Sequence, residues 1–548
     1  MSSLFLTDLT SSFRLSISLF YFHPASLLKF RILKFLSKLI MVKYKEVAIS
    51  EFFEKNSHLL GFDNPVKALM TVIKEAVDNS LDACEEADIL PDIIVKIKNI
   101  KENIFQIIVE DNGPGIEEKY VKQVFGKLLF GSKFKSLGEA GMQSRGQQGI
   151  GISASILYAQ LTTGEPALIE SKVKNKMHYS CKLIIDTSKN IPVIIDEKKL
   201  ETIKEHGTKI TLKLKGVYRK VKGPEDFLKY VAIANPHAQI TFFGPDGSKK
   251  VFKRVVNKLP KKPKKVKPHP HGVELGTLIK MLSQTKSRTL QAFLINDFSK
   301  VGNTGAKEIC SLAKLNLQTR PNAINREQAS KLLAAMQQVK LQRPPTDCLS
   351  PIGEENIIKG LSKEYPADFV AACTRPVAVY RAIPFQVEVG LVYSKELPTD
   401  KQINLIRFAN KVPLFYQQSE CGTYKAVVKT SWKRYGLQQS AGSLPIGPVV
   451  LAIHVASVWV PFISEGKQAI APYPEIVKEI KLALLELGRK LQRYISAEQK
   501  KYARVRKIKL YEKYSTEVAT SLAELTGKNK DDIMALLKRE IAKRGEGL

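Results

Sequence analysis

The 548-residue chain has little cysteine and few acidic residues, and these shortages exclude several classes of protein. Its six cysteines form no Cys-x-x-Cys pair, which argues against a zinc ribbon and a disulfide framework and fits a reducing cytoplasm. The 53 Asp and Glu face 86 Lys and Arg, a formal net charge of +33. A thermophile-like surface would add both signs of charge, so the excess favours a polyanionic partner, with nucleic acid as the first candidate.

The chain also lacks an unbroken apolar run of membrane length. Residues 5–40 are apolar but dotted with Lys and Arg, and they have neither a basic start nor a small-residue cleavage site. We therefore expect no membrane partner. Residues 1–42 are interpreted as an N-terminal extension, disordered or an over-extended start, with an amphipathic membrane-surface helix as the minority alternative.

Residues 43–258 alternate between helical and strand patterns. Apolar spacing predicts helices over 66–87, over 117–130 and from residue 152. The Gly-, Ser- and Gln-rich segment 131–151 is too long for an ordinary connection and predicts a lid. Predicted strands are 93–97, 104–109, 168–173, 179–185 and 208–214.

Residues 259–548 divide by composition into three further parts. Prolines and lysines at 260–268 predict an extended, solvated linker, which begins an all-helical module ending at 345. The predicted helices of that module are 275–281, 289–294, 305–312 and 327–339. An α/β region, 346–510, follows with strands at 385–392, 426–430 and 449–460 and a long helix over 473–509, and a helical tail occupies 511–548.

Two polar residues on the first predicted helix are candidates for nucleotide chemistry. Glu75 and Asn79 are four residues apart and therefore share one helix face. A carboxylate can orient an attacking water while an amide oxygen ligates magnesium. Taken alone the pair is weak evidence, because a surface Glu and a capping Asn are more common.

Two glycine-containing turns follow. Asp111-Asn-Gly113-Pro-Gly115 ends a predicted strand, where Asp111 could accept a hydrogen bond from the exocyclic amine of a purine. Residues 144–151, Ser-Arg-Gly-Gln-Gln-Gly-Ile-Gly, precede a helix whose N-terminus would bind phosphate. Each motif alone is more often an ordinary turn or loop.

The ordered set of these features resembles the GHKL ATPase superfamily and its Bergerat nucleotide-binding fold. The resemblance implies ATP and Mg²⁺ as ligands, with Glu75 as the general base, Asn79 as the magnesium ligand and Asp111 as the adenine reader. Thr208, after Gly207, would support the adenine contact. The implied triphosphate loop comprises Gly141, Met142, Gln143, Ser144, Arg145, Gly146, Gln147, Gln148, Gly149 and Gly151, with Gly113 and Gly115 in the adenine turn.

A second Gly-rich stretch is a near miss for a different motif. Residues 126–133, Gly-Lys-Leu-Leu-Phe-Gly-Ser-Lys, echo Walker A spacing but have Ser and Lys in the wrong order and follow a helix. We interpret Ser132 and Lys133 as lid-hinge residues near the ribose and phosphates.

The remainder of the chain resembles one branch of the superfamily, the B subunits of type IIB DNA topoisomerases. The helical insert, including 271–277 and 301–305, resembles a helix-two-turns-helix module, and 449–467 resembles a transducer domain. The resemblance implies that Lys467, after a strand, touches the γ-phosphate, the group that hydrolysis removes. Lys429 and Lys433 are rival candidates, and a solvated lysine is the usual alternative.

Residues 429–435 interleave cations with aromatic residues and resemble a short Trp-Lys-x-Tyr stretch of that family. A DNA-backbone contact and a buried Trp and Tyr with surface charges are about equally supported. The candidate DNA-contact residues are Trp432, Lys433, Arg434 and Tyr435.

The predicted fold class is α+β multidomain: a Bergerat α/β sandwich ATPase domain (43–258), a linker and helix-two-turns-helix module (259–345), a transducer (346–510) and a tail (511–548). No Asp-x-Asp pair occurs, so the metal-dependent cutting of double-stranded DNA is assigned to a partner. The resemblance implies a topoisomerase that relaxes supercoils by ATP-driven clamping, a B homodimer and an A2B2 heterotetramer with a separate A subunit. The alternatives are a GHKL mismatch-repair-type ATPase and a DNA-binding scaffold with a degenerate nucleotide pocket.

Overall fold

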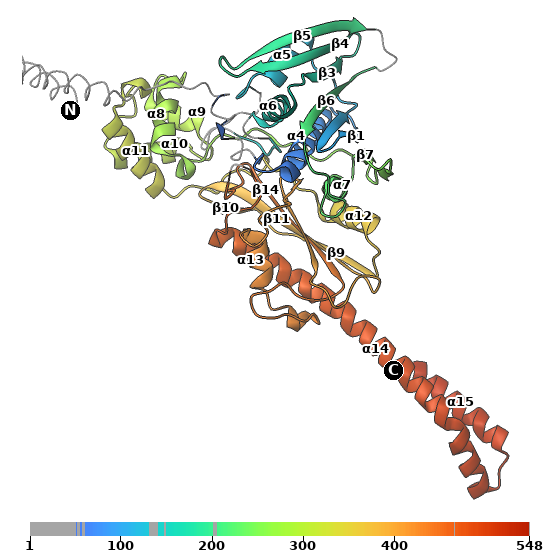
Figure 1. Ribbon diagram of the computed structural model, residues 1–548. Helices are drawn as coiled ribbons and strands as arrows, with labels where there is room; N and C mark the ends of the chain where they lie inside the picture. The colour runs from blue at the N-terminus through green and yellow to red at the C-terminus, as the bar shows by residue number, and fades with distance from the viewer. Residues whose placement is uncertain are drawn as a thin grey trace, which may run out of the picture. The chain divides into compact units, whose positions relative to one another are not determined.

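The computed structural model describes residues 51, 55–56, 61–130, 141–146, 149–200, 205–464 and 466–546. The predictions for 1–42, Ser132, Lys133, Gln147 and Gln148 lie outside these residues. The part that follows residue 48 forms one compact unit, in which two sheets and a helical module are linked (Figure 1).

The first sheet has eight strands in the order β5-β4-β3-β6-β2-β1-β7-β8, and the β1–β7 pair is parallel. Its residues are buried alternately, as along β2, so one face is apolar. The strands are β1 (Asp92–Lys101), β2 (Ile104–Glu110), β3 (Ala167–Lys172), β4 (His178–Asp186), β5 (Ile191–Leu200), β6 (Gly207–Lys215), β7 (Gln239–Phe243) and β8 (Lys249–Phe252). All five predicted strands of this region are confirmed, and β5, β7 and β8 were not predicted.

Helices α4 (Pro65–Glu86), α5 (Glu118–Gly126), α6 (Gly151–Thr163) and α7 (Pro224–Ala234) pack on this sheet. Helix α4 starts where Asn64 accepts a hydrogen bond from Lys67 N and Pro65 occupies the first turn, a strong start signal. The predicted helix 117–130 is too long, because α5 ends at Gly126, whose missing side chain makes room for Pro192.

The helical module contains α8 (Leu275–Gln284), α9 (Leu290–Asp297), α10 (Asn303–Ala313) and α11 (Arg326–Gln338) around its own apolar core. All four predicted helices are confirmed with small shifts of their ends. The preceding linker is extended and its lysines are exposed to solvent, as predicted, but its backbone is also bonded to neighbouring segments. Val266 pairs with Gly141 through two backbone hydrogen bonds of 3.0 Å, and Lys264 N donates to Asp347 O.

The second sheet has the order β10-β11-β14-β12-β13, with β9 also pairing with β11. Strand β14 (Val449–Ser457) is central and buried along its whole length, which suits a strand covered on both faces. The other strands are β9 (Phe369–Thr374), β10 (Ala378–Tyr380), β11 (Ile383–Tyr393), β12 (Asn404–Ala409) and β13 (Val412–Pro413).

Helices α12 (Glu354–Glu364) and α14 (Pro474–Thr526) cover this second sheet. Helix α12 also packs on α7 of the first sheet, and a side chain at Gly360 would come within 2.4 Å of Ile233 O. Ile233 and Ile357 belong to one apolar cluster, so the two α/β units share buried surface.

Two predictions for the C-terminal region need correction. The proposed strand 426–430 is wrong, because this stretch lies mostly in α13 (Gly422–Val428), whose Ala426 and Val427 pack in the core with α14. The long helix does not end near 509 but continues to Thr526, and α15 (Lys530–Glu546) packs back along it (Figure 1). Within the described residues, no helix is both long and apolar enough to cross a bilayer.

Candidate functional site

A cavity of about 390 Å³ opens between α4, the end of β2 and the start of α6. It brings together residues that are far apart in the sequence and come from both α/β units. Of the predicted site residues, those that line it are Glu75, Asn79, Asp111, Gly115, Gly146, Gly149, Gly151, Thr208 and Lys467.

Helix α4 presents Glu75 and the exposed Asn79 to this cavity, as their spacing of four predicted. Lys74 Nζ lies 2.6 Å from Glu75 Oε1 and 3.5 Å from Asp78 Oδ2. Burial raises the pKa of Glu75, but Lys74 and Lys467 outweigh it and the net pKa is lowered. Glu75 is therefore an ionised carboxylate at neutral pH.

Asp78, on the same helix, has the opposite electrostatic balance. Burial raises its pKa to about 6, and the charge of Glu75 adds to this while Lys74 opposes it. Two carboxylates on one turn of α4 thus have different protonation behaviour, and of the two Glu75 lines the cavity.

Asp111, which follows β2 directly, is held in a fixed orientation where it lines the cavity. Its Oδ2 accepts from Ser80 Oγ at 2.8 Å, and its Oδ1 accepts from Gly113 N at 2.9 Å and from Thr208 N at 3.1 Å. Asp111 N donates to Thr208 O at 2.9 Å, which fixes the two predicted adenine residues together. An oriented, mostly buried carboxylate of this kind can read an amine donor.

Two glycines permit the close approach of backbone that shapes the cavity. Gly115 has φ +73°, and a side chain there would lie 2.0 Å from Lys172 O. A side chain at Gly151 would lie 1.8 Å from Glu75 Oε2, so only glycine lets the first turn of α6 meet the carboxylate. Helix α6 has no side-chain cap at its N-terminus, and the N–H groups of such a first turn suit an anion.

Lys467 enters the cavity from the loop after β14, in the second α/β unit. Its backbone has φ +52°, and its N–H donates to Ser464 O at 3.0 Å. Its positive charge contributes to the lowered pKa of Glu75. The rival residues Lys429 and Lys433 are exposed and do not line the cavity.

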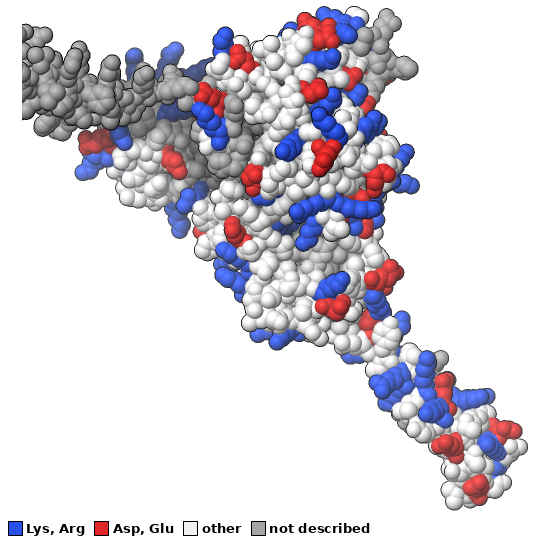
Figure 2. All heavy atoms as spheres, in the orientation of Figure 1, with Lys and Arg blue, Asp and Glu red and all other residues white. Residues whose placement is uncertain are grey.

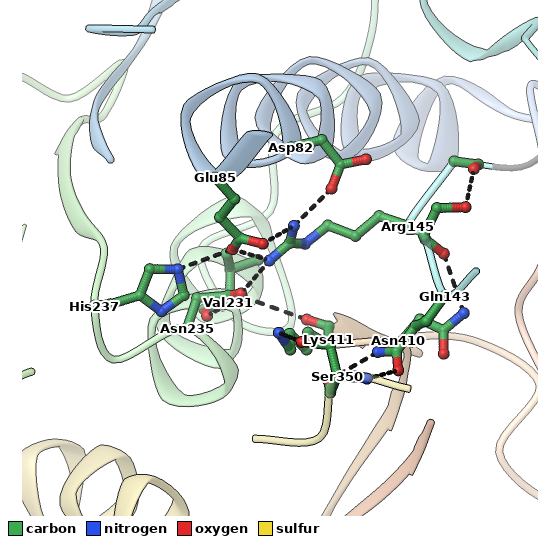
Figure 3. A network of polar contacts seen from close by, with 12 residues as sticks. Asp82, Glu85, Gln143, Arg145, Val231, Asn235, His237, Ser350, Asn410 and Lys411 are labelled. Carbon is green, nitrogen blue, oxygen red and sulfur yellow. Dashed lines mark hydrogen bonds and ion pairs between the residues drawn. The ribbon is translucent and has the colours of Figure 1, made fainter. Parts of the chain in front are cut away.

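The first half of the predicted triphosphate loop does not line this cavity, which corrects the prediction for residues 141–145. Gly141 pairs with the linker, and Gln143 is buried against Ser350, with side-chain hydrogen bonds of 2.7 and 3.1 Å to its backbone. Arg145 points away from the cavity to Asp82, Glu85 and Asn235 (Figure 3). A second, smaller cavity is lined by this turn, including Met142 and Ser144.

The Arg145 guanidinium is almost fully buried and pairs with carboxylates of α4. It lies 2.6 Å from both Asp82 Oδ1 and Glu85 Oε1, and Glu85 Oε1 is also 2.8 Å from His237 Nε2. Burial raises the pKa of Glu85, but Arg145 and the His237 hydrogen bond outweigh it and hold the pKa well below its usual range. These ion pairs occupy Arg145, so it is a structural residue here.

Comparison with known proteins identifies both α/β units. Residues 64–216 match the model of histidine kinase-, DNA gyrase B- and HSP90-like ATPases, and residues 344–507 match the transducer of the topoisomerase VI B subunit. The B subunit of type 2 DNA topoisomerase 6 from Methanosarcina acetivorans is 47% identical over 518 residues, covering 92% of this chain and 83% of that protein. The chain belongs to the topoisomerase VI B-subunit family.

Other relatives of the same name agree. The protein of Archaeoglobus fulgidus is 46% identical and covers 91% of this chain and 82% of its own length. The protein of Thermococcus kodakarensis is 38% identical and covers 90% of this chain and 93% of its own length. Among solved structures, the ATPase domain of Thermus thermophilus gyrase B with an aminocoumarin covers 88% of this chain and 99% of its own, at 13% identity and a TM-score of 0.38, too low to support a conclusion. Membership of the topoisomerase VI B family decides against the mismatch-repair alternative, and the two matched models confirm the GHKL ATPase and transducer fold.

The Trp432–Tyr435 stretch of this topoisomerase VI B-type chain is a short helix, and it corrects half of the predicted DNA contact. Trp432 is fully buried and its indole N–H donates to Val427 O at 2.9 Å, while Tyr435 is 7% exposed and packs edge-on to Trp432. Neither ring can reach DNA from this position. Lys433 and Arg434 are exposed and stay candidates.

Sequence reasoning missed several residues of the topoisomerase VI B-type cavity. Lys74 pairs with Glu75, and the available signal was its spacing of four from Asp78. Phe62, which stacks on Tyr158 at 4.9 Å, Thr71 and Phe130 also line the cavity. Single apolar residues at chain positions so far apart carry no local signal.

Proposed function

We propose that this chain is the ATP-binding and ATP-hydrolysing subunit of a type VI DNA topoisomerase. One observation carries the proposal: residues of the ATPase unit and a transducer lysine line a single cavity. Joint lining by two units is what a protein needs if the state of its nucleotide is to alter the arrangement of its domains.

At the nucleotide, each lining group has a distinct task. Asp111 accepts a hydrogen bond from the adenine amine, with Thr208 beside it, and the first turn of α6 binds phosphate oxygens through its backbone N–H groups. Glu75, ionised at neutral pH, takes a proton from the water that attacks the γ-phosphorus. The bond to ADP breaks as the water oxygen bonds to phosphorus.

The residues present fit a magnesium ion held mainly by the nucleotide. Among the described residues, no group of three or more His, Cys, Asp or Glu side chains could hold a metal by itself. Magnesium is commonly bound by one or two protein oxygens plus substrate phosphates, and the exposed amide of Asn79 in the cavity supplies one such oxygen. When bound, the ion would offset phosphate charge.

The γ-phosphate acts as the switch in this proposal. ATP holds Lys467 in the cavity through its γ-phosphate, two B chains dimerise, and a second DNA duplex is trapped. The A subunit cuts the first duplex within an A2B2 heterotetramer in the cytoplasm. Hydrolysis removes the group that Lys467 binds and releases the clamp.

Replacing Lys467 should change the affinity for ATP but not the affinity for ADP. Lys467→Ala is expected to weaken a non-hydrolysable ATP analogue about 10- to 100-fold and to leave ADP affinity unchanged, because the charge-assisted bond to the γ-phosphate is removed. Isothermal titration calorimetry measures both affinities, with Lys429→Ala as the matched control. An equal loss for both nucleotides would remove the sensor role.

DNA contact is supported by the charge of the surface. Lys and Arg side chains are spread over the described face in Figure 2, among fewer acidic ones. Such a surface holds phosphates with little sequence preference, and its affinity is sensitive to salt.

The double substitution Lys433→Ala, Arg434→Ala tests one part of that surface. We expect weaker duplex binding and a slope of log affinity against log salt that is shallower by roughly 0.9 for each phosphate no longer neutralised. Fluorescence anisotropy at several salt concentrations measures this. Lys198→Ala, Lys199→Ala is the control, because these lysines of β5 already face Asp196 and Glu118 at 3.7 and 2.9 Å. Equal slopes in both double variants would contradict the contact.

The decisive test of the whole proposal is relaxation of supercoiled DNA by the chain mixed with a type VI A subunit in the presence of Mg-ATP. Relaxation that requires both proteins and ATP is expected. A chain that binds DNA but neither binds nor hydrolyses nucleotide would instead favour the DNA-binding scaffold.

A further inference from the structure

Asn410 lies at the turn between β12 and β13 and makes three side-chain hydrogen bonds in two directions. Its Nδ2 donates to Ser144 O at 3.0 Å and to Ser457 O at 2.9 Å, and its Oδ1 accepts from Ser457 N at 2.9 Å. The residue is 5% exposed. One buried amide therefore joins the turn before the glycine loop to the last residue of β14.

On the ATPase side, the bonded segment is itself fixed to the helix that carries Glu75. Ser144 precedes Arg145, whose guanidinium is paired with Asp82 and Glu85 of α4 (Figure 3). Gly146 and Gly149, shortly after Arg145, line the nucleotide cavity. Ser144 is therefore held in a fixed position relative to the glycines that line the cavity.

On the transducer side, Ser457 is the point where β14 ends and the segment leading to Lys467 begins. Its Oγ accepts from Trp459 N at 3.2 Å and donates to Pro384 O at 3.1 Å. Lys467 follows ten residues later and lines the cavity. A displacement of Ser457 would move the base of the segment that holds the lysine.

We propose that Asn410 is a positioning residue that fixes the transducer segment bearing Lys467 relative to the glycine loop, so that the lysine meets the terminal phosphate. The inference rests on the proposed function, since it deepens the role of the same cavity. Asn410 touches no nucleotide and acts through Ser144 and Ser457.

The chemistry of this position suits asparagine. Only an amide offers two N–H donors and an acceptor at the end of so short a side chain. The backbone of Asn410 has φ +49°, a conformation that Asn and Gly tolerate better than other residues. Glycine therefore removes all three side-chain bonds without backbone strain, and aspartate keeps the acceptor but loses the donors.

The test compares Mg-bound ADP with a Mg-bound, non-hydrolysable ATP analogue on the full chain. Asn410→Gly is expected to lower the affinity for the analogue about tenfold and to leave ADP affinity unchanged, because the fault lies at the γ-phosphate. The double variant with Lys467→Ala should bind the analogue no more weakly than Lys467→Ala alone, since both changes act on the same bond. Asn410→Asp should also lower the affinity for the ATP analogue and leave ADP affinity unchanged.

Asn175→Gly is the matched control, because Asn175 has φ +62° in an exposed turn between β3 and β4. It should leave both affinities unchanged, and thermal unfolding should show each variant folded. The positioning role is overturned if the effects of Asn410→Gly and Lys467→Ala add, or if Asn410→Gly lowers ADP affinity as much as analogue affinity. It is also overturned if Lys467→Ala leaves the difference in affinity between the analogue and ADP unchanged. A wild-type chain that binds neither nucleotide would instead overturn the proposed function.

Discussion

Replacement of Glu75 by alanine is expected to lower ATP turnover about 10²- to 10⁴-fold while Mg-nucleotide binding is retained. The carboxylate is the acidic group of α4 that both lines the cavity and meets the first turn of α6, with Gly151 directly against it. Removing it leaves the adenine and phosphate contacts in place but removes the proton acceptor. Single-turnover hydrolysis and calorimetry together measure this split between chemistry and binding.

Two further variants make that result specific. Glu75→Gln keeps the volume and an acceptor for Lys74 but cannot act as a base at neutral pH, so it should lose turnover as Glu75→Ala does. Glu355→Gln is the control, because Glu355 faces Lys359 at the same 2.6 Å on the exposed side of α12 and should leave turnover unchanged. If Glu75→Ala still hydrolyses ATP at the normal rate, the assignment of the base is wrong.

The parts of the site that were predictable are those encoded over a few residues. Glu75 and Asn79 share a helix face because of their spacing, and the Asp111 turn follows its strand directly. Lys467 was named only through resemblance to a family. Nothing in the loop 461–467 by itself shows that it returns to a cavity formed almost 400 residues earlier.

The errors have a common physical cause, which is that local patterns do not encode distant partners. The predicted triphosphate loop, residues 141–151, looks uniform in composition, yet its residues 141–145 contact the linker and the transducer, through Gly141 with Val266 and Gln143 with Ser350. Aromatic residues among lysines suit either a DNA surface or a core, and burial of Trp432 under α13 decides for the core. The β-branched stretch 426–430 favours a strand locally, but packing against α14 makes it helical.

The Arg145 cluster shows why one of these errors matters for stability. Two carboxylates of α4, Asp82 and Glu85, are largely buried on the same helix that carries Glu75. Their charges are balanced by a guanidinium from a different segment. Loss of the guanidinium leaves both carboxylates buried without that cation, which is more damaging than loss of the whole cluster.

Arg145→Met should therefore destabilise the chain by about 3–5 kcal/mol, a fall of roughly 6–20 °C in unfolding temperature. Neutralising the partners as well, in Asp82→Asn, Glu85→Gln, Arg145→Met, should recover much of this loss. Differential scanning calorimetry measures both, with exposed Arg326→Met as the control.

The pH dependence of that destabilisation gives a further check, and its sign follows from Glu85. In the wild type its pKa is depressed, so the stability it contributes is present above the ordinary pKa of 4.5 and is lost as the pH falls through the folded value. In Arg145→Met, burial acts without the guanidinium and raises that pKa, so the carboxylate takes up a proton more readily as the pH falls and the unpaired charge is relieved. The difference in the free energy of unfolding between Arg145→Met and the wild type should thus become smaller from pH 8 to pH 5. A gap that is constant or widens would show that lost packing, and not the unpaired carboxylates, destabilises the variant.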